Sequence, residues 1–253
     1  MSELLDIRLE GDVCVLTLRR PEKLNAISTQ VERALGAALD GEIVRGSRAL
    51  VLAGEGRAFS AGADITEFQE RDPGAIMAYY RDTGAVYERF ARLPIPTFVA
   101  IHGYCLGGAL ELALAADFRI ADETAVFGLP EVALGILPSS GGTHRLVRLL
   151  GTARAKELAL LRERLDAQEA MRVGLVTEVV REGDALARAL ELAGRLAALP
   201  PLAISVTKEA IDAMGESSRE ASVLVERIAY AALAQTAEAQ AAIDSFAQRK
   251  RRE

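Results

Sequence analysis

Two glutamates stand in segments that are otherwise almost entirely apolar. Glu111 lies within Ala109–Ala116, whose other side chains are all Ala or Leu, and Glu131 follows Pro130 in a stretch with almost no polar side chain before Ser139. A carboxylate in apolar surroundings is costly to desolvate unless it is paired or functional. Two such carboxylates could move protons to and from a substrate. The alternative for Glu111 is a solvent-facing position on an amphipathic helix.

Two turns that contain glycine could supply backbone N–H donors for the same chemistry. Gly107 and Gly108 follow an expected strand and begin the helix of Glu111, where free N–H groups and the helix dipole favour developing negative charge. A second such turn lies at Ala61–Ala63. Two carboxylates together with two donor-rich turns suit proton transfer beside a stabilised enolate oxygen.

Ser60 offers a different chemistry, that of a serine nucleophile. The segment Ala58–Gly62 is one residue away from the Gly-x-Ser-x-Gly elbow of serine hydrolases, because Ala replaces the first Gly of that turn. Only His102 and His144 could act as the base. The simpler interpretation of the segment is a Gly-rich turn after a strand.

The elements that must position these segments alternate between strand and helix in the first half of the chain. Apolar runs predict strands at Val13–Leu18, Ala49–Ala53, Thr97–Ile101, Phe118–Ala121 and Ala125–Phe127, and helical spacing predicts helices at Thr29–Asp40, Asp72–Arg92 and Ala109–Ala116. From Gly142 onward helices dominate, with a strand at Val176–Val180 and a long helix or helix pair at Ser218–Gln248. The pattern predicts an α/β fold around a mostly parallel sheet, followed by a helical C-terminal part.

Two of these helices carry start signals. Ser28 is the expected N-cap of the helix from Thr29. Asp72 and Pro73 suit the cap and first position of the next helix, whose buried side we expect to hold Ile76, Tyr80, Val86 and Phe90.

Composition excludes several classes of protein. The 253 residues are 50% hydrophobic and 26% charged, with a net charge of −6, which argues against a nucleic-acid partner. The basic end at Arg249–Arg252 is interpreted as a solvated helix terminus. From two Cys and two His we expect neither a zinc cluster nor a disulfide framework, and no apolar run approaches the roughly 20 residues of a membrane span. We therefore expect a metal-free cytoplasmic protein without a signal peptide or membrane segment.

Four segments together resemble the crotonase (enoyl-CoA hydratase/isomerase) superfamily. They are Arg20–Ser28, Ala58–Ile65, Ala100–Ala121 and Phe127–Leu146, and the resemblance covers essentially the whole chain. It implies a core of repeated ββα units that form a spiral over residues 1–195 and a helical trimerisation region over residues 196–253. It also implies an acyl-CoA substrate and a homotrimer or homohexamer, the latter a dimer of trimers.

The resemblance assigns roles residue by residue. The N–H groups of Ala61 and Gly108 would form an oxyanion hole for the thioester carbonyl, and we expect Gly108 to have no room for a side chain. The backbone around Leu24, Ala26, Ala63, Asp64 and Ile65 would hold the adenine and pantetheine of CoA, with Lys23 near its phosphates and with Gly107, Pro130 and Ser139 completing the substrate site. No cofactor is implied, since CoA is part of the substrate.

Glu111 and Glu131 occupy the positions of the glutamate pair of hydrating members of the superfamily. The resemblance thus favours hydration of trans-2-enoyl-CoA to 3-hydroxyacyl-CoA, an activity of fatty acid β-oxidation. Two alternatives stay open within the fold: an enoyl-CoA isomerase, or a hydrolase or lyase acting on a cyclic or branched acyl-CoA. A non-catalytic scaffold or RNA-binding relative is the alternative of another class.

The chain departs from the family pattern at three places, of which His144, in place of a common Gln, is expected to have no catalytic effect. Ser139 stands where hydratases usually have Gly, whose N–H helps to hold the added water. Leu161-Arg162 replaces a Thr-Gly turn, which suggests a longer or differently ended helix there. The sequence leaves the acyl chain open, although Met77, Tyr79 and Tyr80 are candidates for the pocket wall.

Overall fold

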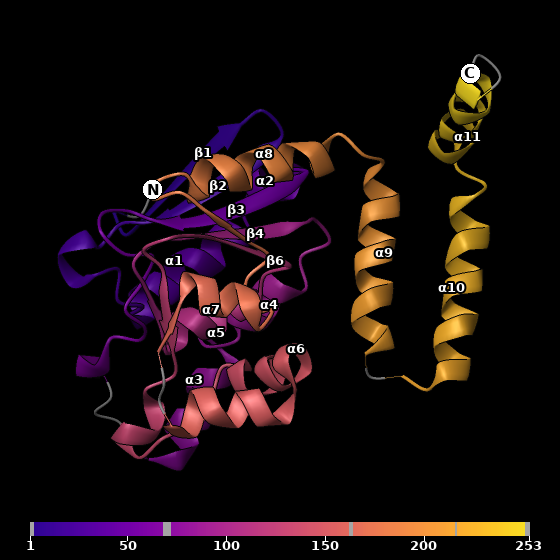
Figure 1. Ribbon diagram of the computed structural model, residues 1–253. Coiled ribbons are helices and arrows are strands. Elements are labelled where there is room, and N and C mark those ends of the chain that lie inside the picture. Colours follow the sequence, from indigo (N-terminus) through magenta and orange to yellow (C-terminus); the bar gives the residue numbers. More distant parts are fainter. Residues whose placement is uncertain (1–2, 68–71, 162–163, 216, 251–253) are drawn as a thin grey trace.

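Two β-sheets form the centre of the molecule (Figure 1). The structure is a computed structural model, which describes residues 3–67, 72–161, 164–215 and 217–250. Within these residues the larger sheet has six strands in the spatial order β1, β2, β3, β4, β6, β9. Their bounds are Leu5–Glu10 (β1), Val13–Leu18 (β2), Ala49–Gly54 (β3), Thr97–Ile101 (β4), Phe118–Asp122 (β6) and Glu178–Val180 (β9). β1 and β2 are antiparallel, and the later neighbouring pairs are parallel. The predicted α/β class with a mostly parallel sheet is confirmed.

A smaller sheet lies beside the large one and gives the fold its repeat. It pairs β5 (Tyr104–Leu106), β7 (Val126–Gly128) and β8 (Leu165–Asp166), and single bridges of Ser60 with Cys105 and Ile27 with Ala63 extend this layer. After β3, β4 and β6 the chain moves from the large sheet to this layer and then into a helix. This is the repeated ββα pattern expected from the resemblance, and it brings segments 60–63, 104–107 and 126–131 side by side.

Helices cover both faces of the large sheet. α8 (Ala185–Ala197) packs its alanines onto one face, against side chains such as Val51 and Phe98, while Leu52 and Ile101 point into the core on the other face (Figure 1). The other helices of the core are α1 (Thr29–Leu39), α2 (Glu42–Gly46), α3 (Pro73–Arg81), α4 (Val86–Ala91), α5 (Gly108–Leu114), α6 (Gly142–Lys156) and α7 (Ala167–Arg172). Because both faces are buried, the parallel strands are continuously apolar instead of alternating.

The helix expected over Asp72–Arg92 is divided into α3 and α4. Its start is as predicted, because the Asp72 side chain accepts a hydrogen bond from Ala75 N and Pro73 is the first helical residue. Val86 and Phe90 are buried as predicted, but Ile76 and Tyr80 are not. At the break, a Cβ on Gly84 would come within 3.1–3.2 Å of the rings and backbone of α3, so the chain folds back tightly there and one continuous helix is not possible.

Three strands were not predicted from the sequence. β5 and β8 have three and two residues, which is too short to show a period of two. β1, in contrast, alternates apolar and charged residues in LDIRLE and could have been predicted. The expected strand Val176–Val180 is shortened to β9. The segment before Arg162 ends in a π-helical turn at Glu157–Leu161, in agreement with the differently ended helix expected there, although Arg162 itself lies outside the described residues.

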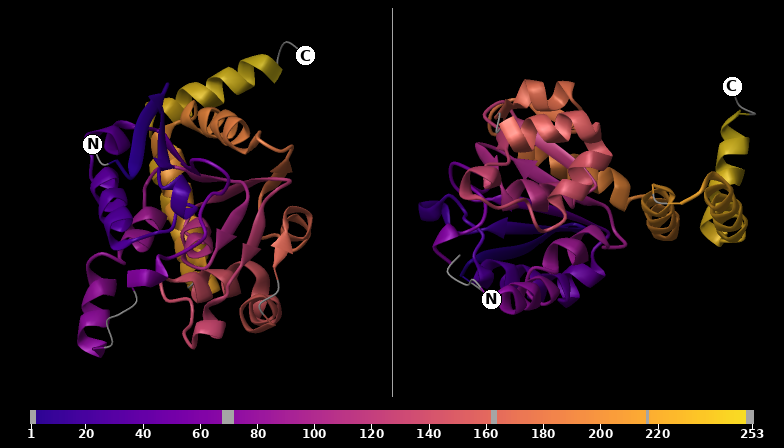
Figure 2. Two further views of the ribbon diagram at one scale, coloured as in Figure 1. Left: turned by 90° about the vertical axis from the view of Figure 1, so that its left-hand side faces the viewer. Right: turned by 90° about the horizontal axis from the view of Figure 1, so that it is seen from below.

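Three helices extend away from the core at the C-terminal end (Figure 2). They are α9 (Pro201–Met214), α10 (Arg219–Leu233) and α11 (Ala237–Lys250), so the stretch expected at Ser218–Gln248 is a helix pair. α9 contacts the core through Lys208, whose Nζ lies 2.9 Å from Asp117 Oδ2 and donates to Ile95 O at 3.2 Å. The boundary at residues 195 and 196 stays a prediction. Among the described helices none is by itself long and apolar enough to cross a membrane; only α8 and α9 together reach that composition, and they are bent by 109°.

Candidate active site

Glu111 is buried inside the core. It lies one turn into α5, its residue is 4% exposed, and Oε1 accepts hydrogen bonds from Ser140 N at 2.8 Å and Gly142 N at 2.9 Å. A Cβ on Gly142 would stand 2.4 Å from Glu111 Cγ, so only glycine lets the first turn of α6 approach the carboxylate this closely. Burial raises the pKa of Glu111, and the backbone N–H groups oppose that rise. The solvent-facing alternative is therefore wrong.

Glu131 lies close to the N-terminus of α5, in the segment that follows β7. It is the first residue of the short helix η3 (Glu131–Leu134), and its Oε1 lies 3.0 Å from the point where a Cβ on Gly107 would stand. Its Oε2 is buried without a hydrogen-bond partner among the described residues. Burial raises the pKa of Glu131 to about 7, and the nearby charge of Glu111 adds to the rise. The structure thus brings the two carboxylates into one site.

Two backbone N–H groups border the space next to these carboxylates. Gly108 N begins α5, and Ala63 N lies 3.5 Å from the point where a Cβ on Gly108 would stand. Within the described part of the chain, neither N–H donates a hydrogen bond. Both donors are therefore available to a carbonyl oxygen of a ligand.

The assignment of Ala61 as a donor does not fit this structure. Its N–H donates to Leu24 O at 2.9 Å, so that hydrogen bond would have to break before Ala61 could bind a ligand. The free donor of this turn is Ala63, two residues further on. The sequence shows only that the turn is rich in N–H groups, and which of them is free depends on the pairing with the segment from Leu24 to Ile27.

Gly108 also has more room than expected. A Cβ there would meet the Tyr87 hydroxyl at 3.4 Å and Ala63 N at 3.5 Å, which are ordinary contacts. One methyl group would therefore fit the protein. It would nevertheless occupy the space between the two free N–H groups.

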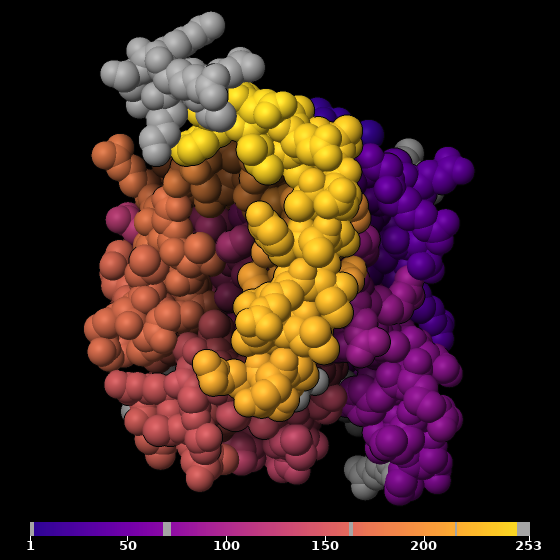
Figure 3. All heavy atoms as spheres, turned by 90° about the vertical axis from the view of Figure 1, so that its right-hand side faces the viewer, coloured from indigo at the N-terminus to yellow at the C-terminus, as the bar shows by residue number. Residues whose placement is uncertain are grey.

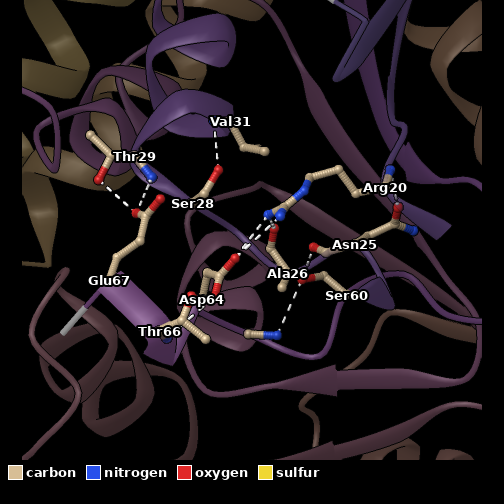
Figure 4. Close-up of polar contacts among 11 residues, drawn as sticks. Arg20, Asn25, Ala26, Ser28, Thr29, Val31, Ser60, Asp64, Thr66 and Glu67 are labelled. Carbon is tan, nitrogen blue, oxygen red and sulfur yellow. Dashed lines mark hydrogen bonds and ion pairs between the residues drawn. The ribbon is translucent and has the colours of Figure 1, made fainter. Parts of the chain in front are cut away.

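A network of polar contacts fixes the turn that carries Ala63 (Figure 4). The Arg20 guanidinium lies 3.2 Å from the Asp64 carboxylate and donates to Ala26 O at 2.8 Å. On either side of Ala63, Ile27 N donates to Gly62 O and Asp64 N donates to Ile27 O, each at 2.8 Å. The direction of the Ala63 N–H is thus set by contacts to a different loop.

Ser60 belongs to this network and not to a catalytic triad. The residue is fully buried, its hydroxyl donates to Asn25 O at 2.7 Å, and its oxygen accepts from Gly62 N at 3.2 Å (Figure 4). His102 Nε2 is engaged with Gly56 O at 2.9 Å instead. The serine-nucleophile hypothesis is contradicted, and the interpretation as a structural turn holds.

The residues expected to bind CoA lie around the same two loops. Leu24 and Ala26 are half-buried in one loop, Asp64 and the exposed Ile65 follow Ala63 in the other, and Lys23 is exposed at the end of the short helix η1 (Pro21–Lys23). The remaining expected residues, Pro130 and Ser139, are exposed beside Glu131 and beside the N–H groups that bind Glu111. The structure therefore groups these residues, while their contacts with a substrate stay predictions.

Sequence reasoning missed two features of the site. Gly142, which lets α6 reach Glu111, has no signal beyond its place in a Gly-Gly pair. Glu32 is also buried, beside Val31 and three positions before Leu35 on the apolar side of α1, a place that helical spacing from the Ser28 cap could have shown.

The arrangement can stabilise negative charge on a carbonyl oxygen and move protons at neighbouring carbons. Glu111 has the hydrogen-bond partners of an anion, and Glu131 has a pKa at which it gains or loses a proton near neutrality. Among the described residues, no three His, Cys, Asp or Glu side chains are grouped so as to hold a metal ion. A cavity of about 900 Å³ lies elsewhere, between α9 and the core, and neither carboxylate lines it.

Comparison with known proteins gives one consistent family. The family model described as "Enoyl-CoA hydratase/isomerase" matches residues 8–253. The chain is 34% identical to the short-chain-enoyl-CoA hydratase of Clostridium acetobutylicum, covering 96% of this chain and 94% of the relative. It is 36% identical to the 2,3-dehydroadipyl-CoA hydratase of Escherichia coli, covering 99% and 97%. Its fold matches the crystal structure of an enoyl-CoA hydratase from Bacillus anthracis with a TM-score of 0.90 at 32% identity, over 97% and 96% of the two chains.

An α/β spiral with paired carboxylates beside two free amides defines an enzyme of the crotonase class. The chain belongs to the enoyl-CoA hydratase/isomerase family.

Proposed function

We propose that this enzyme hydrates trans-2-enoyl-CoA thioesters to 3-hydroxyacyl-CoA. The observation that carries the proposal is the pair of buried carboxylates, Glu111 and Glu131, together with the free N–H groups of Ala63 and Gly108 at the start of the helix of Glu111. Conjugation of the C=C bond with the thioester lets negative charge develop on the carbonyl oxygen as water adds to C3. Each preorganised N–H donor at such an oxygen typically contributes about 10²–10³ in rate.

The two glutamates divide the proton transfers in this proposal. Glu111, whose Oε1 accepts two backbone N–H bonds, is the base that takes a proton from water as the hydroxide oxygen bonds to C3. The electron pair of the C=C bond moves onto the thioester as an enolate. Glu131, with its pKa near 7 and its unpartnered Oε2, gives the proton that C2 takes up when the enolate collapses. Exchange with solvent then returns a proton to Glu131 and removes one from Glu111.

The remaining parts of the substrate fit the surrounding loops. In the proposal, the loop of Leu24 and Ala26 and the segment Ala63–Ile65 hold the adenine and pantetheine, with Lys23 near the phosphates. The reaction needs no cofactor besides the CoA of the substrate. The relatives' names cover a short-chain and a 2,3-dehydroadipyl substrate, so the acyl chain of this enzyme is a matter for a substrate panel.

The test is turnover of a panel of short- to long-chain enoyl-CoAs, with products identified by mass spectrometry. Starting from crotonyl-CoA, we expect Glu111→Gln and Glu131→Gln each to lower kcat by at least about 10²-fold, because each removes a positioned acid or base. Binding of butyryl-CoA, which has no C=C bond to hydrate, should stay near the wild-type value. Glu42→Gln on exposed α2 is the matched control.

The outcomes separate the open alternatives. Near-wild-type kcat in either site variant would refute the role of that glutamate. A 3-enoyl product in place of 3-hydroxyacyl-CoA would show an isomerase, and release of free CoA would show a hydrolase. Absence of turnover for every acyl-CoA, combined with RNA binding that weakens with salt, would favour the non-catalytic relative.

A further inference from the structure

A third carboxylate lies buried beside the proposed site and takes no part in the proposed proton transfers. Glu32 on α1 is 4% exposed, and the Tyr79 hydroxyl of α3 donates to both of its carboxylate oxygens, at 2.7 and 2.6 Å. An apolar side chain would fill this place on α1 without the cost of desolvating a charge. The hydrogen bonds that satisfy Glu32 therefore point to a role beyond packing.

A second tyrosine connects Glu32 to the two free amides. Tyr87 on α4 is 3% exposed, and its hydroxyl faces the Glu32 carboxylate closely enough to lower the pKa of that carboxyl. The same hydroxyl oxygen lies 3.4 Å from the point where a Cβ on Gly108 would stand, and Ala63 N lies 3.5 Å from that point. Tyr87 thus forms a wall of the space between the amides, and Glu32 holds the rotation of its O–H.

We propose that Glu32 is a positioning residue of this active site, which holds the Tyr87 hydroxyl beside the Gly108 and Ala63 amides. The inference rests on the proposed function for the identity of the reacting ligand. Its physical content is that the width of the oxyanion pocket depends on Tyr87, and that the orientation of Tyr87 depends on a carboxylate that touches no substrate.

Four polar or charged side chains from other elements face Glu32. Glu67, Glu111 and the two tyrosines face it, and like-charge repulsion from Glu67 and Glu111 adds to burial in raising the pKa of Glu32. Burial keeps Tyr87 a neutral phenol, because the pKa of Tyr87 lies well above its usual value.

Glu111 is surrounded by other polar and charged groups as well. Arg145 and the N–H groups before α6 also face Glu111 and oppose the rise in its pKa.

The decisive variants are Tyr87→Phe and Glu32→Gln, with Glu42→Gln as the control. We expect Tyr87→Phe to lower kcat by about tenfold while KM changes less than about threefold, because the pocket binds the thioester but no longer fixes it. Glu32→Gln should also lower kcat, with a similarly small change in KM, because Tyr87 then loses the carboxylate that its hydroxyl faces. Wild-type kcat in Tyr87→Phe, or wild-type kcat in a folded Glu32→Gln, would overturn the proposal.

A second readout separates this inference from the proposed hydration. Exchange of the C2 hydrogens of butyryl-CoA with deuterium from D₂O, followed by mass spectrometry, requires the oxyanion pocket and an acid-base group but no water addition. We expect Tyr87→Phe to slow this exchange about tenfold as well. If the wild type exchanges but does not hydrate, the proposed function fails while the role of Tyr87 is still tested. If Glu32→Gln does not fold, Tyr87→Phe decides alone, since it keeps the Tyr79 contact.

Discussion

The core and the C-terminal helices differ in how far they bury their apolar side chains. All seven residues of α5 are buried, including a glutamate, whereas no residue of α9 or α10 is buried although both carry large apolar side chains. Ile211 of α9 is 63% exposed, and Leu224 and Ile228 of α10 are 58% and 61% exposed. The single chain thus buries the helix that carries Glu111, while it leaves the C-terminal surface uncovered.

The contact between α9 and the core is also poor in buried apolar side chains. It relies on polar contacts of Lys208, and a cavity of about 900 Å³ separates much of the helix from α4, α5 and α6. Figure 3 shows α10 and α11 as an outer ridge on this side of the molecule. Apolar surface of this extent is typical of an interface, and we propose that a second copy of the chain covers it in a homotrimer or homohexamer.

The largest expected effect concerns the buried side of this comparison. Gly108→Val places a branched side chain between the free N–H groups of Gly108 and Ala63, and Gly108→Pro removes one donor. We expect both to reduce turnover of every acyl-CoA by about 10³-fold or more in steady-state assays, without any change in assembly.

Ser60→Ala is the matched control for the two Gly108 variants. Its hydroxyl contacts only backbone groups among the contacts described, so it should keep most of the activity. An inactive Ser60→Ala with an active Gly108→Val would contradict the family's mechanism for this chain.

The next effect concerns the exposed side. Ile228→Asp places a charge on the apolar surface of α10, at a position that is exposed to solvent in the single chain. We expect the assembly to dissociate, with little change in the fold of the isolated chain, as measured by light scattering and circular dichroism at micromolar concentration. Wild-type protein that is monomeric at that concentration would refute the assembly proposal.

The smallest effect concerns the stability cost of the site itself. Glu131 has a pKa of about 7 in the fold, against the ordinary value of 4.5 for a glutamate, so its ionisation weakens the folded state as the pH rises between those two values. Glu131→Gln removes that cost, and we expect the free energy of unfolding to rise by roughly 1–3 kcal/mol at about pH 8. Near pH 4 the variant and the wild type should melt alike, because Glu131 is then protonated in both states. Equal melting temperatures at the higher pH would show that the carboxylate is solvated.

Much of the fold was predictable because its signals are local. Apolar runs marked β2, β3, β4, β6 and β7, and the side chains of Ser28 and Asp72 cap α1 and α3 as their types indicate. The strands β5 and β8 were not predictable, because so few residues carry no periodicity and pair only when the neighbouring strand is already in place.

For the site, the sequence by itself determined the residue types: two glutamates in apolar segments and two turns rich in N–H groups. Only the tertiary structure decided which groups are used. Ala61 and Ala63 are chemically equivalent in the sequence, and the hydrogen bond from Ala61 to Leu24 leaves Ala63 as the free donor. The pKa of Glu131 and the burial of Glu32 are likewise products of packing, because desolvation depends on which distant segments exclude water from a carboxylate.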